Sequence, residues 1–586
     1  MVVKDLRDQR LGRLQGRRLF LLLVGCGLWS ALLLGRLIYV QLVLHDQMVG
    51  YAREQQQRVV ELPAKRGNLL DRANRLLASS IDETSIYVHP KLLPNRTMAA
   101  AWLAPALGVP TSDLVSRLEG DGRFVWLARK APPAVVEAVR KVVSAHRLHL
   151  SVGFIKESKR YYPNRTLAAQ VLGYVDVDNR GQAGVEYSFD EIIRGQPGRW
   201  LVWRDGADQP VDPDGLMRRD PTPGRDLGLT IDAIIQTAAE SALERAVREH
   251  QAAGGSVVVM DPRTGAILAL ASYPTFNPNV HDKALLTQSH NQPIMYAYEP
   301  GSTFKMFTAA AAFQEGLVDE KEPIDCQGGT LRVANHLYHD WRPGFETMPF
   351  REVLVNSSNV GMIKVGLRLT PDRFLGWLRQ FGFGEVTGID LPGEATGILR
   401  ATDRWSSLSQ SSMVIGQEVS VTPLQLATAA SAVANGGRLM QPYVVGRILD
   451  EDGHIVQERK PRARRQVIDA EIAHRLNGVL EGVVSGSSAT ATAAAIPGFR
   501  VAGKTGTAQK IGPDGRYSQY VASFLGILPA TNPRLVVLVM IEAPTRGYYG
   551  SHVAAPAFRT IADTAIRTLR IPPDAPVPEM LVDGAS

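Results

Sequence analysis

Cysteine is nearly absent from this chain of 586 residues, which contains only Cys26 and Cys326. Cys26 lies inside an apolar N-terminal stretch, so no disulfide between the two is expected and the chain is not a disulfide-stapled scaffold. A zinc site at Cys326 is the alternative, because His336, His339 and Asp340 follow it. Their spacing matches no common zinc site, and a second cysteine nearby is missing. We therefore favour a structural role for this segment and expect no metal ion and no cofactor.

The chain also lacks a long basic run with interleaved aromatic residues, and it lacks any internal repeat of roughly 20–50 residues. Its net charge is +7, and its contents of 45% hydrophobic and 21% charged residues are ordinary for folded protein. Nucleic acid is therefore not an expected partner, whereas an anionic lipid or a cell-surface polymer suits the charge equally well. A chain of 586 residues exceeds one hydrophobic core, so we expect two or more domains.

One long apolar run is present, from Leu19 to Val43, interrupted by Arg36 near its end. A bilayer core requires about 20 apolar residues, so residues 19–43 are predicted to form a transmembrane helix. Because basic residues precede the run, residues 1–18 are predicted to be a cytoplasmic tail and the rest to lie outside. A cleaved signal peptide is the alternative, but the run is long and no small-residue cleavage site follows Arg36. The basic residues are Lys4, Arg7, Arg10, Arg13, Arg17 and Arg18.

Residues 44–220 are predicted to form a stalk and an α+β pedestal domain. The segment 45–61 is polar and helix-prone, and 133–145 reads as a helix with proline in its first turn. Nothing in this region assembles a nucleophile with a base, so we interpret it as a structural or docking domain. The Pro- and Gly-rich segment 220–225 is the predicted domain boundary.

Residues 225–570 are predicted to form a second domain of α/β type. Strands at both ends of a helical middle indicate one antiparallel sheet flanked by helices. The remaining residues, 571–586, are Pro-rich without periodicity and are predicted to be a flexible or trimmed tail. Expected helices are 233–250, 302–315, 371–381 and 422–435, and expected strands are 255–260, 266–271, 520–528 and 535–541, with a hairpin turn at 261–265.

A candidate nucleophile lies where a Pro-Gly turn leads into the Ala-rich helix expected at 302–315. Ser302 and Lys305 are three positions apart, so both side chains lie on the first turn of that helix. A serine hydroxyl needs a neighbouring base to become a nucleophile, and a desolvated lysine can act as that base. A Ser-x-x-Lys pattern alone is weak evidence, because short patterns occur by chance in a chain of this length.

Two further motifs follow in the order that such a site requires. The first is Ser357–Asn359, a Ser-x-Asn element, and the second is Lys504–Thr507, the rarer sequence Lys-Thr-Gly-Thr. A second Ser-x-Asn, Ser289–Asn291, precedes Ser302 and is discounted for that reason. Together the three motifs supply a nucleophile, a base, a proton relay and a cationic anchor for an anionic peptide end, which two-step acyl transfer requires.

The three motifs in this order resemble those of class B penicillin-binding proteins, which are membrane-anchored peptidoglycan D,D-transpeptidases. The resemblance covers nearly the whole chain, since 66–72, 184–186 and 229–232 also have family counterparts. The segment 548–556, the overall size and the lack of a domain after residue 570 resemble the division-type branch (FtsI, penicillin-binding protein 3). The resemblance implies a β-lactamase-like transpeptidase fold and a single-pass protein of the bacterial inner membrane, active outside the cytoplasm at the division septum.

The resemblance also implies a role for each site residue. Ser302 attacks the penultimate D-alanine carbonyl of a stem pentapeptide, and Lys305 takes its proton. Ser357 passes a proton toward the leaving D-alanine, while Asn359 orients the substrate amide and Lys305. Backbone N–H groups of Ser302 and Thr507 form the oxyanion hole. The implied binding residues are Lys504, Thr505, Gly506 and Thr507, which hold the substrate carboxylate, and Tyr548 and Tyr549, for which a packing role stays open.

Partners implied by the resemblance are peptidoglycan stem peptides, β-lactam antibiotics, an FtsW-type polymerase of the lipid-linked glycan and other membrane proteins of the division complex. An elongation-type transpeptidase of side-wall synthesis is the nearest alternative. A β-lactamase would need a deacylating water held by a carboxylate and no anchor, and a penicillin-sensing receptor would need a cytoplasmic signalling module. A mainly scaffolding role in the division complex is the remaining alternative, although the intact motifs argue against a dead enzyme.

Overall fold

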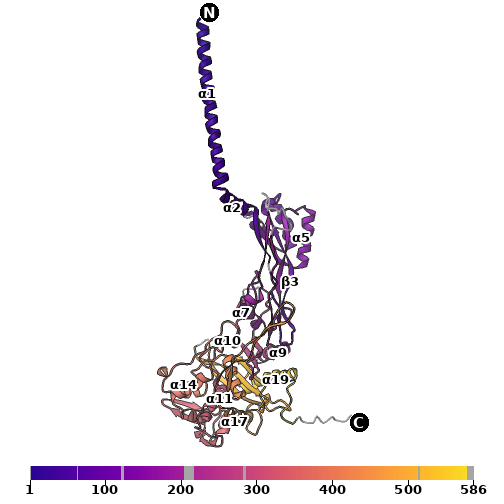
Figure 1. Ribbon diagram of the computed structural model, residues 1–586. Helices are drawn as coiled ribbons and strands as arrows, with labels where there is room; N and C mark the ends of the chain where they lie inside the picture. Colours follow the sequence, from indigo (N-terminus) through magenta and orange to yellow (C-terminus); the bar gives the residue numbers. More distant parts are fainter. Residues whose placement is uncertain are drawn as a thin grey trace, which may run out of the picture. The chain divides into compact units, whose positions relative to one another are not determined.

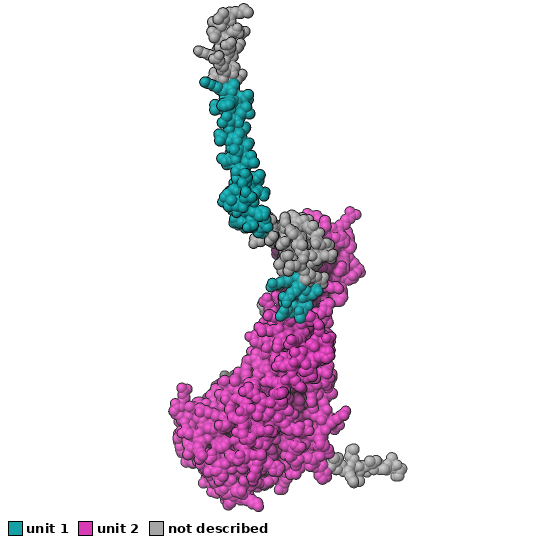
Figure 2. Space-filling view, in the orientation of Figure 1, with its two compact units in different colours: residues 1–64, 196–222 teal, residues 65–195, 223–586 magenta. Residues whose placement is uncertain are grey.

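The computed structural model describes residues 2–62, 64–120, 124–203, 217–280, 285–512 and 515–576. Contacts divide the chain into two compact units, coloured separately in Figure 2. The smaller unit comprises residues 1–64 and 196–222, and the larger unit comprises 65–195 and 223–586.

The smaller unit begins with helix α1 (Val2–Ile38), which continues into a π-helical turn, Tyr39–Val43. Within the described residues, Gly16–Val43 is long and apolar enough to cross a membrane, in agreement with the predicted span at 19–43. The predicted helical stalk at 45–61 is wrong in its last part, because helix α2 ends at Gln56 and a strand follows. That strand, β1, pairs with β6 in an antiparallel sheet of order β1-β6-β7. The bounds are α2 (His45–Gln56), β1 (Gln57–Leu62), β6 (Gly198–Trp203) and β7 (Met217–Arg219).

The larger unit contains a mixed sheet of order β17-β16-β8-β2-β3-β4, with β5 also paired to β3. Strand β8 follows the predicted boundary at 220–225, yet it pairs in parallel with β2, which precedes that boundary. One sheet therefore joins segments on the two sides of the boundary, and the boundary itself stays a prediction. The strands are β2 (Leu69–Leu70), β3 (Leu76–Val88), β4 (Val125–Ala131), β5 (Val152–Tyr161), β8 (Asp226–Leu229), β16 (Val445–Leu449) and β17 (Ile455–Glu458).

Three helices pack beside β3 and β4 around a separate apolar core that includes Leu103, Leu114 and Val139. Helix α5 spans Pro133–Ala145, as predicted, with proline in its first turn, where no helical hydrogen-bond donor is needed. Antiparallel pairing of β3 with β4 and β5, with helices packed beside these strands, confirms the α+β expectation. The other two helices are α3 (Arg96–Leu107) and α4 (Thr111–Glu119), and three short helices follow, α6 (Ala169–Leu172), α7 (Gly184–Ser188) and α8 (Asp190–Ile193).

A five-stranded antiparallel sheet of order β10-β9-β21-β20-β19 forms the centre of the remaining chain. Alternate residues of its central strands enter different cores, because successive side chains of a strand point to opposite faces. Val257 and Val259 pack with α9 and α19 on one face, and Val258 and Met260 pack with α11 and α16 on the other. Figure 1 labels α9, α11 and α19. The bounds are β9 (Gly254–Met260), β10 (Ile267–Tyr273), β19 (Ala502–Ile511), β20 (Tyr517–Leu528), β21 (Leu535–Glu542), α9 (Ala233–Glu249), α11 (Lys305–Gln314), α16 (Pro423–Ala434) and α19 (Ala555–Leu569).

This arrangement confirms the predicted antiparallel sheet flanked by helices, and the turn at 261–265 joins β9 to β10 as expected. Besides α11 and α16, further helices lie between β10 and β19 in the chain. They are α10 (Gln292–Met295), α12 (Phe350–Val355), α13 (Asn359–Gly366), α14 (Pro371–Gln380), α15 (Ser409–Val414) and α17 (Ala470–Leu480), with the strand pairs β11 (Pro323–Asp325) and β14 (Thr347–Pro349), β12 (Thr330–Val333) and β13 (His336–His339), and β15 (Arg438–Met440) and β18 (Ala463–Gln466).

The first part of the predicted flexible tail is wrong. Ile571 is buried, and the Asp574 carboxylate accepts hydrogen bonds from the Arg500 backbone N–H at 2.7 Å and the Thr531 hydroxyl at 2.7 Å. These contacts fix the chain beyond α19, although its composition is Pro-rich. Residues 577–586 of the predicted tail lie outside the described residues.

Candidate active site

Ser302 lies in a short 3-10 turn, Gly301–Phe304, and the regular α-helix begins only at Lys305. The predicted start of the α-helix at Ser302 is therefore three residues too early, but both side chains still occupy one continuous helical turn. Gly301 has a φ of +55°, and its N–H donates to the Gly416 carbonyl at 3.0 Å. Phe304 is fully buried below the turn, which leaves Ser302 at the surface of a cleft.

The amine of Lys305 is fully buried and held by three oxygens. Its Nζ donates to Asn359 Oδ1 at 2.6 Å, to the Ser357 carbonyl at 2.7 Å and to Ser357 Oγ at 3.3 Å. Burial lowers the pKa of Lys305 to about 7, against the opposing charge of Asp340. A large fraction of Lys305 is therefore neutral near pH 7, as a general base must be.

The hydroxyl of Ser357 lies between two buried lysines. Lys504 Nζ donates to Ser357 Oγ at 2.9 Å and to the Thr505 carbonyl at 3.2 Å. Burial, and secondly the charge of Lys305, lower the pKa of Lys504 well below its usual value. Among the described residues neither lysine pairs with a carboxylate. Ser357 is thus placed to carry a proton between the two amines and a bound molecule.

Ser357 itself has a φ of +59°, in the left-handed region that a residue with a side chain rarely adopts. It joins α12 to α13 at a tight corner, and such backbone strain often accompanies function. The neighbouring Ser358 caps α13 through its hydroxyl, which accepts from the Gly361 N–H at 3.0 Å. The Ser358 cap and the tight corner at Ser357 together orient the Ser357 and Asn359 side chains toward Lys305.

Asp340 is a supporting residue that the sequence analysis assigned only to a structural segment. Its carboxylate accepts from the Asn359 backbone N–H, from the Val360 N–H at 3.1 Å and from the Ser358 hydroxyl at 2.9 Å. The preceding carbonyl, that of His339, accepts from Asn359 Nδ2 at 2.6 Å. Asn359 therefore turns its amide oxygen toward Lys305. The segment with His339 and Asp340, considered above as an alternative zinc site, thus orients the Ser-x-Asn corner.

The Lys504–Thr507 motif occupies β19, the edge strand of the five-stranded sheet. Thr505 and Thr507 line the cleft, whereas Lys504 is fully buried. Glycine is required between the two threonines, because a Cβ at Gly506 would lie 2.9 Å from Thr303 Cγ2 and 2.3 Å from Ser523 Oγ. This close approach brings the strand against the turn that carries Ser302.

Two tyrosines form part of the rim above β19. Tyr548 stacks on Tyr520 with ring centres 4.5 Å apart, and Tyr549 lies 4.5 Å from Tyr548. Tyr548 and Tyr549 are 38% and 40% exposed and line the cleft, so they are not core residues. Their contribution to binding stays a prediction.

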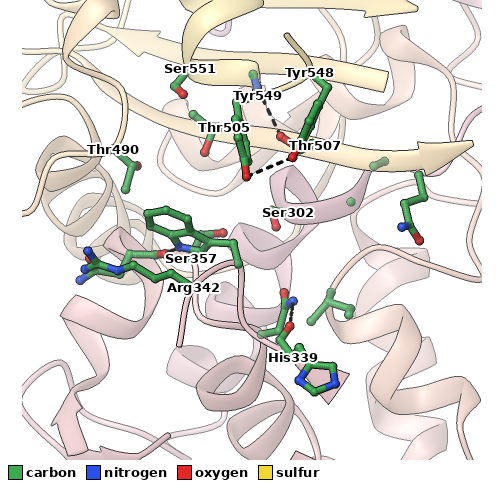
Figure 3. A pocket seen from close by; sticks show the side chains of 18 of the residues that line it. Ser302, His339, Arg342, Ser357, Thr490, Thr505, Thr507, Tyr548, Tyr549 and Ser551 are labelled. Carbon is green, nitrogen blue, oxygen red and sulfur yellow. Dashed lines mark hydrogen bonds between the residues drawn. The ribbon is translucent and has the colours of Figure 1, made fainter. Parts of the chain in front are cut away.

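The cleft has a volume of about 910 Å³ and contains Ser302 near its middle (Figure 3). Of the ten predicted site residues, seven line it and the other three, Lys305, Lys504 and Gly506, lie directly behind its wall. The sequence analysis missed several lining residues, which come from loops and from strands β13 and β20 and belong to no recognisable motif. They include His336, Tyr338, Trp341, Arg342, Gln417, Thr490 and Tyr520.

Comparisons with known proteins agree with this geometry. Residues 255–563 match the penicillin-binding protein transpeptidase domain, and residues 61–229 match the penicillin-binding protein dimerisation domain. A probable peptidoglycan D,D-transpeptidase PbpC of Pseudomonas aeruginosa is 33% identical, with 92% of this chain and 93% of the relative covered. The chain is a class B penicillin-binding protein.

Further relatives of this class B penicillin-binding protein include peptidoglycan D,D-transpeptidase FtsI of Escherichia coli, 33% identical over 95% of this chain and 92% of that protein. Among solved structures, penicillin-binding protein 3 of Mycobacterium tuberculosis complexed with aztreonam has a TM-score of 0.68 and 27% identity. That match covers 88% of this chain and 99% of the other. The recognised family and fold are thus confirmed, and the apolar N-terminal helix agrees with a single-pass membrane protein.

Proposed function

We propose that this penicillin-binding protein cross-links peptidoglycan stem peptides as a D,D-transpeptidase, through an acyl-enzyme on Ser302. One observation carries the proposal: the amines of Lys305 and Lys504, both buried, donate to the same hydroxyl, that of Ser357, in the cleft that Ser302 also lines. Desolvated amines without carboxylate partners are proton carriers rather than structural ions.

In the first half-reaction, neutral Lys305 takes the proton of Ser302 Oγ as that oxygen attacks the penultimate D-alanine carbonyl. Backbone N–H groups of Ser302 and Thr507 hold the developing oxyanion, a contribution usually worth a few kcal/mol per donor. The bond to the terminal D-alanine nitrogen breaks, and Ser357 relays a proton to that leaving amine. The products are an ester on Ser302 and free D-alanine.

In the second half-reaction, an amine of a neighbouring stem peptide attacks the ester carbonyl. Its excess proton returns through Ser357 and Lys305 to the Ser302 oxygen, which leaves as a hydroxyl. A new peptide bond then links the two stems. The substrate carboxylate binds Lys504, Thr505 and Thr507 on β19, and a β-lactam that mimics this peptide end blocks Ser302 by the same first step.

The test is covalent labelling of the full chain by a fluorescent penicillin. Ser302→Ala should abolish the label completely, whereas Ser485→Ala, which removes an exposed hydroxyl outside the cleft, should label as the parent does. A label that persists on Ser302→Ala at another residue would refute the assignment.

We further propose that the cross-linking takes place at the division septum, with the N-terminus in the cytoplasm and the catalytic domain outside. The likeness to FtsI supports this branch, and an FtsW-type polymerase with other division proteins would be its membrane partners. Depletion in cells tests the proposal, because filaments indicate a division role and round cells indicate side-wall synthesis.

A further inference from the structure

The described residues that line the cleft include a positively charged side chain but no negatively charged one. Among these described residues there is no aspartate or glutamate, and Arg342 is the one permanently charged side chain. Three histidines, His336, His339 and His552, also line the cleft. A cleft with this lining favours an anionic ligand over a cationic one.

Arg342 is held by aromatic rings rather than by a carboxylate. Its guanidinium lies 5.0 Å from the ring centre of Trp341 and 4.8 Å from that of Phe345. In the described part of the chain it forms no ion pair, whereas the nearby Arg351 and Arg368 pair with Glu320 and Glu322. Stacking orients the planar guanidinium while its N–H groups stay available to a ligand.

This aromatic support is connected to the catalytic corner. The Trp341 indole N–H donates to the Asn356 carbonyl at 2.9 Å, one residue before Ser357. Phe345 is buried, which fixes the second ring. The exposed loop that carries Arg342 is thus tied to the residue before Ser357 by the Trp341 hydrogen bond and to the core by Phe345.

Hydroxyl groups occur at the same end of the cleft. Ser487, Ser488 and Thr490 line it, and Figure 3 shows Thr490 and Arg342 on the same side of Ser302. A guanidinium near hydroxyl donors is a suitable site for a carboxylate, which it can bind through two parallel hydrogen bonds. Tyr548 lies on the other side of Ser302 in this view.

We propose that Arg342, supported by Trp341 and Phe345, forms a second carboxylate subsite, which binds an acidic side group of the substrate peptide. The proposal rests on the proposed function, because Lys504, Thr505 and Thr507 already account for the terminal carboxylate. Arg342 thus selects peptides that carry an additional negative charge away from their D-alanyl-D-alanine end.

The experiment uses the full chain in detergent and two synthetic peptides ending in D-alanyl-D-alanine, one with an internal glutamate and one with glutamine in its place. Each peptide competes with a fluorescent penicillin, and its apparent inhibition constant is measured. The parent protein should bind the glutamate peptide about tenfold more tightly, as expected for one charge-assisted contact. Arg342→Gln should abolish this preference by weakening the glutamate peptide alone, and Arg342→Lys should retain part of it.

Arg332→Gln is the matched control, since Arg332 is an exposed arginine of the β12–β13 hairpin that precedes Arg342, and it is not among the residues that line the cleft. It should keep the tenfold preference, and thermal unfolding should show that Arg342→Gln is folded. The subsite is refuted if the parent protein shows no preference, or if Arg342→Gln keeps it. Failure of the proposed function looks different, because the parent protein would then not be labelled by penicillin at Ser302.

Discussion

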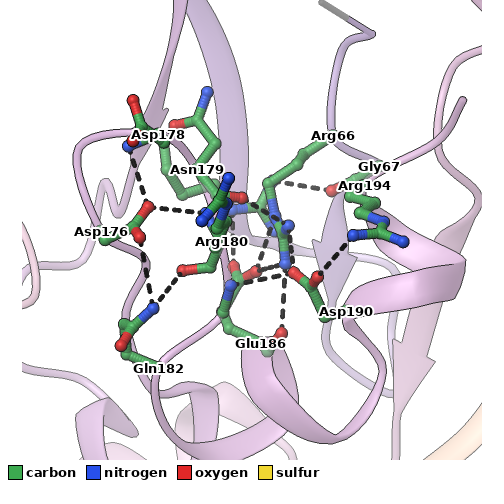
Figure 4. Close-up of polar contacts among 12 residues, drawn as sticks. Arg66, Gly67, Asp176, Asp178, Asn179, Arg180, Gln182, Glu186, Asp190 and Arg194 are labelled. Atoms are coloured by element: carbon green, nitrogen blue, oxygen red, sulfur yellow. Dashed lines mark hydrogen bonds and ion pairs between the residues drawn. The ribbon is translucent and has the colours of Figure 1, made fainter. Parts of the chain in front are cut away.

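Two clusters of buried cations in the larger unit use opposite electrostatic arrangements. Around Glu186, Arg66 Nη2 and Arg160 Nε donate to the two carboxylate oxygens, each at 2.6 Å. Asp190 accepts from Arg66 at 2.6 Å, and Figure 4 shows Arg66 between Glu186 and Asp190. Around Ser357, Lys305 and Lys504 are equally buried, but their partners are neutral oxygens.

The difference separates a structural site from a reactive one. At Arg66, burial opposes the positive charge, but Glu186 and Asp190 more than compensate and leave the pKa of Arg66 raised. At Lys305, nothing of comparable strength compensates, and burial lowers the pKa to about 7. A paired buried charge holds the chain together, whereas an unpaired buried amine readily gives up its proton. Three substitutions test this contrast.

Lys305→Met should have the largest effect, a loss of about a thousandfold in the rate of acylation by penicillin, because the general base is removed. The protein should not lose stability. The pKa of Lys305 falls from 10.5 to about 7 on folding, so burial costs stability progressively as the pH falls through that window. Methionine removes that cost, which outweighs the loss of the donor to Asn359 Oδ1, so the free energy of unfolding at pH 7 should be unchanged or higher.

The measurements are stopped-flow acylation and urea unfolding at pH 7. Lys321→Met, which removes an exposed lysine outside the cleft, is the control and should acylate at the parent rate. Retained acylation by Lys305→Met would refute the role of Lys305 as base.

In Glu186→Gln, by contrast, the main effect should be a lower free energy of unfolding. Arg66 and Arg160 would both lose a buried counter-charge, and breaking such a pair typically costs about 3–5 kcal/mol. Urea unfolding measures the loss, and Glu191→Gln, an exposed carboxylate on the next turn, is the control. A Glu186→Gln protein as stable as the control would mean that the cluster does not hold this part of the fold together.

Asp340→Asn should have the smallest effect, a shift in pH dependence. Asparagine preserves an oxygen acceptor for the N–H groups of Asn359 and Val360 but removes the charge that raises the pKa of Lys305. The acid limb of the acylation profile, which follows deprotonation of Lys305, should therefore move to lower pH by about one unit or less.

The profile is read from acylation rates across the neutral range. Glu346→Gln removes an exposed carboxylate from the same loop and should leave the limb unmoved. If the acid limb of the acylation profile of Asp340→Asn stays at the same pH or moves to higher pH, Asp340 acts only through its hydrogen bonds.

Much of the fold was predictable because the sequence patterns that specify its helices and strands are local. The apolar run ending at Val43, the proline that opens α5 and the two apolar strands near the C-terminus each specify their own element. The pairing of β8 with β2 was not predictable, since two short strands far apart in sequence carry no local sign of their partner. The ordering of residues 571–576 was missed for the same reason, because the contacts of Asp574 depend on loops near Arg500 and Thr531.

For the active site, the sequence alone determined the chemical inventory: a serine, two lysines, a Ser-x-Asn corner and a threonine-bearing strand in the right order. Only the tertiary structure decided which lysine contacts which oxygen and that Asp340 orients Asn359. It also decided that Arg342 packs against two aromatic rings in a cleft whose described lining contains no acidic residue. The physical reason is that a pKa and a binding preference depend on burial and on neighbours in space. Neither quantity is a property of a residue type.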